Sequence, residues 1–197
     1  MVTAAAAGAV SSNPGAEGAA APGRTRHDAD VVATEPSAES FAWVPRIPAS
    51  AGALIWDEAR RLLILKPTYK KGWTLPGGQL EPVDESPWDA CRRETFEECG
   101  LRVERARLAC VDFLWSKRTR PGGVRFLFDC GTFDAAALAT IRLDGVEIVE
   151  YRLAELTEAL ELLSGPLRRR VSAVAGPGAG RFRYLEDGRP VAGVDEG

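Results

Sequence analysis

The chain has 197 residues, a length that suits one domain with an appendage and excludes two cores of ordinary size. Apolar residues make up 45% and charged residues 27%, which excludes a disordered or fibrous protein. The net charge of -3 argues against a nucleic-acid binder or a membrane-surface binder, because both need a cationic field. No apolar run approaches the roughly 20 residues that cross a bilayer.

Residues 1–40 contain no Leu, Ile, Phe, Trp or Tyr. Such a segment cannot bury enough apolar surface to offset the entropy of ordering it, so we expect a disordered tail. A secretory signal over Met1–Ser12 is the alternative, but that stretch lacks basic residues before its apolar part and leucine within it. The predicted domain spans residues 41–192 and is followed by a short tail, 193–197.

Four cysteines show no C-x-x-C spacing, and the only histidine, His27, lies in the predicted tail. This pattern argues against a zinc site and excludes histidine as a catalytic base. The cysteines are expected to be small buried groups in a reducing compartment, which together with the missing signal predicts a cytoplasmic location.

Within the domain, Ala51–Trp56 and Arg61–Lys66 are predicted to be short strands, and a loop rich in Lys, Gly and Pro follows over Thr68–Gly78. The later pattern predicts strands and helices that end in a hairpin around Asp187-Gly188. These elements are strands Val103–Trp115, Val124–Phe133 and Val146–Leu153, helices Glu155–Leu163 and Leu167–Val174, and hairpin strands Phe182–Leu185 and Pro190–Val191. The predicted class is α/β, with a mixed sheet and helices on its faces.

The helix predicted over Pro87–Cys99 has clear boundaries. Ser86 is a good N-cap, Pro87 suits the first helical position and Asp89 completes a capping pattern. Gly100 stands where a left-handed residue ends a helix. Trp88, Phe96 and Cys99 are expected to pack this helix on the sheet.

Glu94, Glu97 and Glu98 of this helix are spaced i, i+3 and i+4 and therefore share one face. Each close pair of like charges costs a few tenths of a kcal/mol, a cost that bound Mg²⁺ or Mn²⁺ would offset. The alternative is a solvated surface helix whose glutamates lean toward Arg92 and Arg93. The preceding Pro76-Gly77-Gly78 favours a site, because glycines let the backbone approach a ligand.

The stretch Gly78–Leu101, GQLEPVDESPWDACRRETFEECGL, resembles a Nudix box, whose pattern is G-x5-E-x7-R-E-U-x-E-E-x-G-U with U apolar. Six residues rather than five separate Gly78 from Glu85, and we expect the loop to absorb the extra one. Thr95 replaces the usual aliphatic residue. The matching positions are Glu85, Arg93, Glu94, Glu97, Glu98, Gly100 and Leu101.

The resemblance implies a Nudix-like α/β/α sandwich that hydrolyses the diphosphate linkage of a nucleoside diphosphate derivative with Mg²⁺ or Mn²⁺. By position, Glu94, Glu97 and Glu98 would hold the metal, and Arg93 would orient a helix glutamate. Glu85 would be a supporting carboxylate beside the substrate, while Gly77 and Gly78 would shape the loop next to the phosphates. Trp115 is a candidate for stacking on a nucleobase.

The proton acceptor is left open between Glu97, Glu98 and a later glutamate, for which Glu147 and Glu150 are the candidates. The substrate is left open between a nucleoside triphosphate, oxidised or not, and a nucleotide-sugar-like diphosphate. The alternatives to an enzyme are a non-catalytic nucleotide-sensing module and a purely structural protein. A second copy of the chain, forming a homodimer, is also left open as a partner.

Overall fold

The structure is a computed structural model, which describes residues 46–81, 84–176 and 179–194. The predicted tail 1–40 and residues 195–197 of the predicted C-terminal tail lie outside these ranges. The strands are β1 Ala49–Asp57, β2 Leu62–Pro67, β3 Gly77–Gln79, β4 Arg107–Leu114, β5 Gly123–Phe133, β6 Ile148–Ala154, β7 Arg183–Glu186 and β8 Arg189–Pro190. The helices are α1 Pro87–Cys99, α2 Ala135–Leu138, α3 Leu156–Leu162 and α4 Gly165–Ala175.

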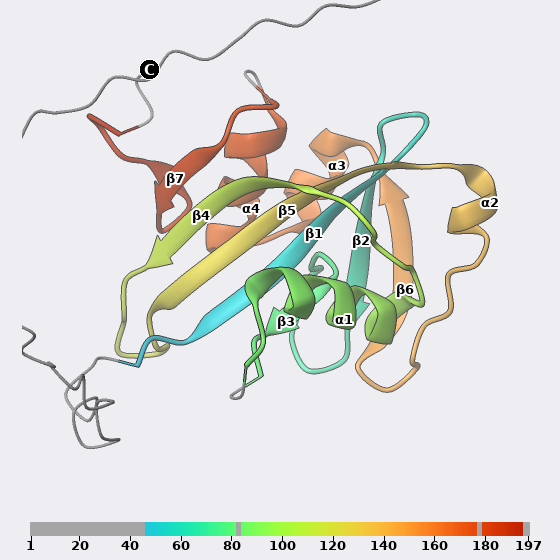
Figure 1. Cartoon of the computed structure of the whole chain (residues 1–197), viewed down its shortest axis with the longest axis horizontal. Coiled ribbons are helices and arrows are strands. Elements are labelled where there is room, and N and C mark those ends of the chain that lie inside the picture. Colours follow the sequence, from blue (N-terminus) through green and yellow to red (C-terminus); the bar gives the residue numbers. More distant parts are fainter. Residues whose placement is uncertain (1–45, 82–83, 177–178, 195–197) are drawn as a thin grey trace, which may run out of the picture. The chain divides into compact units, whose positions relative to one another are not determined.

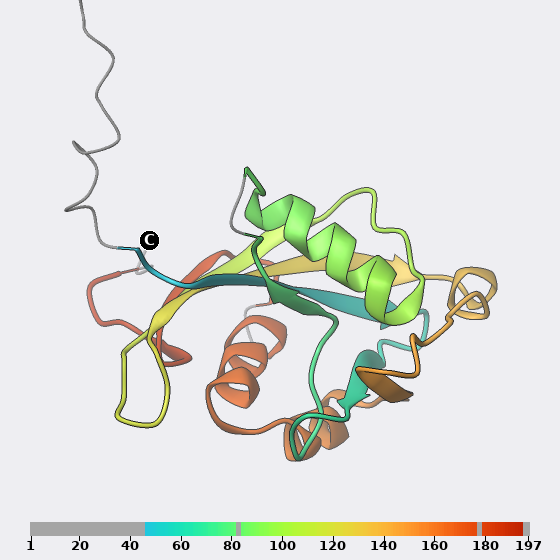
Figure 2. The same cartoon turned by 90° about the horizontal axis from the view of Figure 1, so that it is seen from below.

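The strands form one mixed sheet in the order β6-β2-β1-β5-β4-β7-β8, and β3 pairs with β1 beside this path. The pairs β1–β5 and β4–β7 are parallel, whereas the other pairs are antiparallel. The helix α1 covers one face of the sheet, and α3 and α4 cover the other (Figures 1 and 2). The predicted α/β/α arrangement with a mixed sheet is therefore confirmed.

The central strand β1 shows why the sequence gives three layers. Successive side chains of a strand point to opposite faces of the sheet. Ala53 and Ile55 belong to the apolar cluster that includes residues of α1, whereas Leu54 and Trp56 belong to the cluster that includes residues of α3 and α4. Both faces are covered, so the strand is apolar almost throughout.

The helix α1 begins and ends where its caps predict. The Ser86 hydroxyl accepts a hydrogen bond from the Asp89 amide at 3.1 Å. Gly100 has a φ of 73° and donates its amide to the Phe96 carbonyl at 2.8 Å. The insertion before Glu85 has not changed the bounds of this helix.

The expectation that Phe96 packs on the sheet is wrong, because its side chain is 46% exposed. The guanidinium of Arg102 lies over the ring, 4.5 Å from its centre. The stripe that faces the sheet runs instead through Cys91, Thr95 and Cys99, which are fully buried and spaced four residues apart. Phe96 follows Thr95 directly and is therefore rotated by about 100° around the helix axis from that stripe.

Several boundaries differ from the predictions. The strand expected from Val103 begins at Arg107, and the one expected from Val146 begins at Ile148. The short elements β3 and α2 were not predicted, because Gly77-Gly78-Gln79 has no strand-forming side chains and α2 is a single turn capped by Asp134.

All four cysteines are buried and unpaired, as expected of small apolar groups. Within the described ranges, no helix combines the length and the apolar content that a membrane span requires.

Candidate active site

Arg93 connects the glutamates of α1 to the loop that precedes the helix. Its Nε and Nη2 donate to the two oxygens of Glu85 at 2.7 and 3.0 Å, a bidentate pair. Its Nη1 lies 2.9 Å from Glu97 Oε2 and 3.0 Å from Glu94 Oε1. Arg93 also donates to the Gln79 carbonyl at 3.1 Å. One side chain therefore fixes three of the predicted site carboxylates.

The placement of Glu85 shows that the extra residue of the loop is tolerated. Besides Arg93, the Glu85 carboxylate accepts the Glu81 amide at 2.7 Å. The hydrogen bonds from Arg93 lower the pKa of Glu85, and Glu85 in turn raises the pKa of Arg93. Glu85 is thus held in its charged form by Arg93 and the Glu81 amide.

Glu98 is the most buried of these acids, with 5% of its surface exposed. Its Oε2 accepts the Gly77 amide at 2.8 Å. Burial raises the pKa of Glu98 to about 8 despite the Gly77 amide, and the negative charges of Glu94 and Glu147 add to the rise. Among the described residues, no donor is assigned to Oε1 of this carboxylate.

Gly77 and Gly78 are required by the close approach of β3 to its neighbours. Gly77 has a φ of 137°, and a Cβ there would overlap the main chain at Ala51. A Cβ on Gly78 would overlap the carboxylate of Glu94. Burial raises the pKa of Glu94. The two glycines thus let the helix carboxylates lie directly against the loop backbone.

Glu147 is held near these acids by its backbone. The Asp144 carboxylate accepts the amides of Val146, Glu147 and Ile148 at 3.2, 3.0 and 2.8 Å. The Glu147 carbonyl accepts the Thr68 amide at 2.9 Å. The charge of Glu147 contributes to the raised pKa of Glu94 and of Glu98, so the three acids lie within electrostatic reach of one another.

Two other candidates lie elsewhere. Glu150 is 3.5 Å from Arg152 and faces Lys66 in the β2–β6 pairing. The indole of Trp115 donates to Glu186 at 2.8 Å, and its ring meets Phe113 edge-on at 5.0 Å between ring centres. The predicted stacking role of Trp115 gains no support from this position, since the residue does not line the pocket beside β3.

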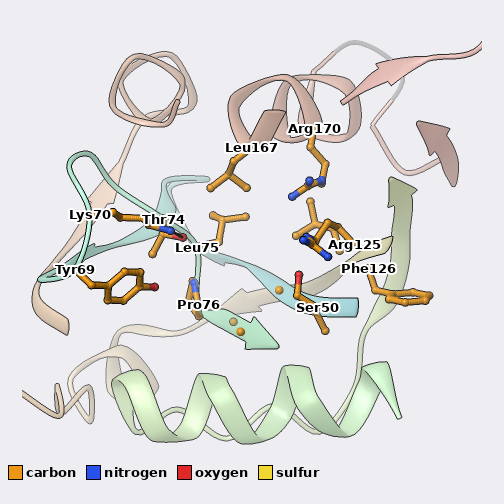
Figure 3. A pocket seen from close by; sticks show the side chains of 15 residues that line it. Ser50, Tyr69, Lys70, Thr74, Leu75, Pro76, Arg125, Phe126, Leu167 and Arg170 are labelled. Atoms are coloured by element: carbon orange, nitrogen blue, oxygen red, sulfur yellow. Dashed lines mark hydrogen bonds between the residues drawn. The ribbon is translucent and has the colours of Figure 1, made fainter. Parts of the chain in front are cut away.

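That pocket has a volume of about 240 Å³ and lies between β1, β3, β5 and α4 (Figure 3). Tyr69 and Lys70 line one end, whereas Arg125 and Arg170 line the other. The backbone of Gly77 and Gly78 lines it as well, so the pocket reaches the loop that Glu98 and Glu94 contact. Sequence reasoning missed Arg125 and Arg170, because no local motif marks either one.

The fit of these residues to a divalent cation can be judged from the donor set. As the side chains stand, no three His, Cys, Asp or Glu side chains of the described ranges form a ready-made metal cluster. Arg93 engages Glu94 and Glu97, and Gly77 engages one oxygen of Glu98. Three carboxylates on one helix face nevertheless supply the hard oxygen ligands that Mg²⁺ and Mn²⁺ prefer. The residues therefore fit such an ion after Glu94 and Glu97 turn away from Arg93.

Comparison with known proteins places this geometry in a family. The MutT-like protein of Streptomyces ambofaciens is 37% identical over 86 residues, covering 44% of this chain and 53% of that protein. Diphosphoinositol polyphosphate phosphohydrolase 3-beta of Bos taurus is 43% identical over 47 residues, covering 24% of this chain and 28% of that protein. The matches span about half or less of these relatives.

Among solved structures, the MutT protein from Methanosarcina mazei Go1 is similar with 27% identity and a TM-score of 0.50, covering 59% of this chain and 82% of that one. A NUDIX hydrolase from Nitrosomonas europaea has 25% identity and a TM-score of 0.50, covering 72% and 80%. The NUDIX domain model matches residues 46–173, which is more than half of the chain. The chain therefore belongs to the NUDIX family.

Proposed function

We propose that the chain is a hydrolase that uses Mg²⁺ or Mn²⁺ to cleave the diphosphate linkage of a nucleoside diphosphate derivative. The observation that carries the proposal is the buried Glu98 carboxylate, held at 2.8 Å by the Gly77 amide next to the acids that Arg93 engages. A buried acid with a raised pKa beside other acids is typical of functional sites.

Glu94, Glu97 and Glu98 would hold the metal in this proposal. A bound divalent ion neutralises phosphate charge and lowers the pKa of a coordinated water. Arg93 would act as a positioning residue, because its fork fixes Glu85 and steers the two helix glutamates that it contacts. The loop at Gly77 and Gly78 would allow the substrate phosphates to approach the helix closely.

Glu147 is our preferred proton acceptor. It is exposed, lies within electrostatic reach of Glu94 and Glu98, and is held by the turn at Asp144. No ion pair involves Glu147 among the described residues, so its exposed carboxylate can receive a proton from an attacking water without first giving up a partner. Glu97 is the alternative, but its carboxylate is engaged by Arg93.

The substrate proposal stays at the level of the diphosphate linkage. The name of one relative, diphosphoinositol polyphosphate phosphohydrolase, adds a polyphosphorylated molecule that is not a nucleotide to the candidates. Nucleoside triphosphates and nucleotide-sugar-like diphosphates are therefore tested together with a polyphosphorylated, non-nucleotide diphosphate.

The test, called phosphate release below, is the release of inorganic phosphate, pyrophosphate or a phosphate monoester from this panel with Mg²⁺, with Mn²⁺ and with EDTA. We expect release that requires the metal and that is lost in Glu97→Gln and Glu98→Gln. Exposed Glu104 lies outside the cluster, so Glu104→Gln is the matched control and should behave like the wild type. Binding of a nucleotide without release would contradict an enzyme and support a sensing module.

A further inference from the structure

A polar row crosses the sheet at the end of the pocket that is far from Lys70. Arg125 of β5 pairs with Ser50 of β1 on one side and with Asp112 of β4 on the other. Arg125 and Ser50 line the same pocket, and Figure 3 shows their side chains close to one another within it. A hydroxyl and a guanidinium from neighbouring strands thus reach the same space.

Asp112 is the acid of this row, and three hydrogen-bond donors other than Arg125 already engage its carboxylate. Its side chain is fully buried, and Oδ2 accepts Nε and Nη2 of Arg170 at 2.9 and 2.7 Å. Its other oxygen, Oδ1, accepts the Gly188 amide at 2.9 Å. Asp112 therefore neutralises Arg170 and leaves Arg125 without a dedicated counter-charge.

The hydrogen-bond partners of Arg125 among the described residues are all neutral. Its Nη1 donates to the carbonyls of Pro48 and Val124 at 3.1 and 3.0 Å, and no ion pair involves its guanidinium in those ranges. Burial lowers the pKa of Arg125, and the positive charges of Arg170 and Arg120 add to the effect, while the negative charge of Asp112 opposes it. The pocket wall therefore carries a half-buried positive charge whose Nε and Nη2 are available to a ligand.

Aromatic stacking does not account for this end of the pocket. Its two aromatic lining residues are Tyr69 and Phe126. Tyr69 lies at the opposite end beside Lys70, whose Nζ is 5.4 Å from the ring centre. Phe126 points away from the pocket and packs with the apolar cluster on the α1 side of the sheet. A flat base therefore has no pair of rings to lie between here, whereas an oxyanion has the charged guanidinium of Arg125 as a donor.

We propose that Arg125, assisted by Ser50, binds a second anionic group of the substrate, a phosphate other than the linkage that is cleaved. This inference rests on the proposed function, since it assumes that the diphosphate lies at the helix carboxylates. Arg125 is then a specificity-determining residue. The favoured substrates are diphosphates whose remaining part carries a further phosphate, rather than those that end in a neutral base or sugar.

The test uses the full chain in EDTA with inorganic phosphate as the probe. Without metal, the acids of α1 repel phosphate, so the remaining binding reports on the pocket. Binding is followed by the NMR signals of the Gly52 amide, which lines the pocket, and of the arginine Nε groups. We expect the wild type to bind phosphate, Arg125→Gln to bind at least about tenfold more weakly, and Arg125→Lys to fall between them.

The matched control is Arg118→Gln, which removes the same charge from an exposed residue outside the pocket and should bind like the wild type. Thermal unfolding of each variant verifies that the fold is kept. Equal affinity in wild type and Arg125→Gln would overturn the inference, and so would the absence of phosphate binding by the wild type. Because EDTA abolishes any metal-dependent turnover, these outcomes are independent of the phosphate-release test of the proposed function.

Discussion

The Gly77 amide donates a 2.8 Å hydrogen bond to the Glu98 carboxylate and so joins β3 to the last turn of α1. Replacement of Glu98 by Gln keeps an oxygen that can accept this bond but removes the ionisable carboxyl group that would bind the metal. We therefore expect Glu98→Gln to unfold close to the wild-type temperature while losing about 100-fold or more of its turnover at saturating Mg²⁺. Thermal unfolding and phosphate release measure the two effects.

Arg93→Lys tests the positioning role of the guanidinium. Lysine keeps the charge but cannot make the two parallel bonds to Glu85 and reach Glu97 and Glu94 at the same time. Turnover should fall about ten- to hundredfold, as it does when a residue that orients a metal ligand is lost. Steady-state kinetics over a series of Mg²⁺ concentrations measures this loss of turnover. The control is Arg92→Lys at an exposed position, which should behave like the wild type. Wild-type turnover in Arg93→Lys would contradict this role.

The two loop glycines should respond differently to alanine. At Gly77 the new methyl meets the main chain at Ala51, and the φ of 137° is unfavourable for it, so we expect a loss of about 1–3 kcal/mol in the free energy of unfolding. At Gly78 the three atoms nearest to the methyl all belong to the movable Glu94 side chain, so activity should fall more than stability. Urea unfolding and phosphate release together distinguish the two variants.

Gly131 offers a reference for the part of the Gly77→Ala destabilisation that comes from the positive φ alone. Its φ is 78°, and nothing lies within 4 Å of an added Cβ. Gly131→Ala therefore reports the cost of a positive φ without an overlap. If Gly77→Ala destabilises the protein no more than Gly131→Ala does, the predicted overlap with the main chain at Ala51 is wrong.

The turn at Asp144 gives a prediction with a defined pH dependence. The amides of Ile148, Glu147 and Val146 lower the pKa of the Asp144 carboxyl. The charged form is thus favoured in the folded state, and its contribution is present above the pKa of the unfolded chain, about 4. It is lost as the pH falls through the lower pKa of the folded state.

We therefore expect Asp144→Ala to lower the free energy of unfolding by about 1 kcal/mol at pH 7, with the difference from the wild type shrinking below about pH 4. Urea unfolding at both pH values measures it. Turnover should also fall if Glu147 accepts the proton, because this turn holds its backbone. A stability difference that grows on acidification would contradict the assigned role of the carboxylate.

Capping and turn residues in the sequence predicted those elements whose bounds depend on contacts between residues close together in the chain. Ser86 and Gly100 set the ends of α1 because their capping bonds involve residues within four positions. The same holds for the hairpin turn at Asp187 and Gly188, whose φ values are 48° and 77°. The carboxylate stripe of α1 was predictable for the same reason, since helical spacing alone places Glu94, Glu97 and Glu98 on one face.

Features that depend on tertiary packing were not predictable in this way. Asp112 and Arg170 are 58 positions apart, and nothing near either residue marks their pairing. Phe96 was predicted to be buried and is exposed. The prediction failed because the helix face that contacts the sheet does not include this position. The β3 strand exists because Gly52 and Ala51 of β1 pair with its glycines rather than because of its own composition.

The Asp112 carboxylate also decides how far the chain can be shortened. The family match ends at residue 173, whereas one of the three donors to this carboxylate is the amide of Gly188. Trimming the protein to the boundary of the match would leave a buried acid short of a donor and would uncover the β4 edge that β7 now pairs with. Anyone preparing a shorter version for crystallisation should therefore retain the sequence through Pro190, or expect a protein that self-associates.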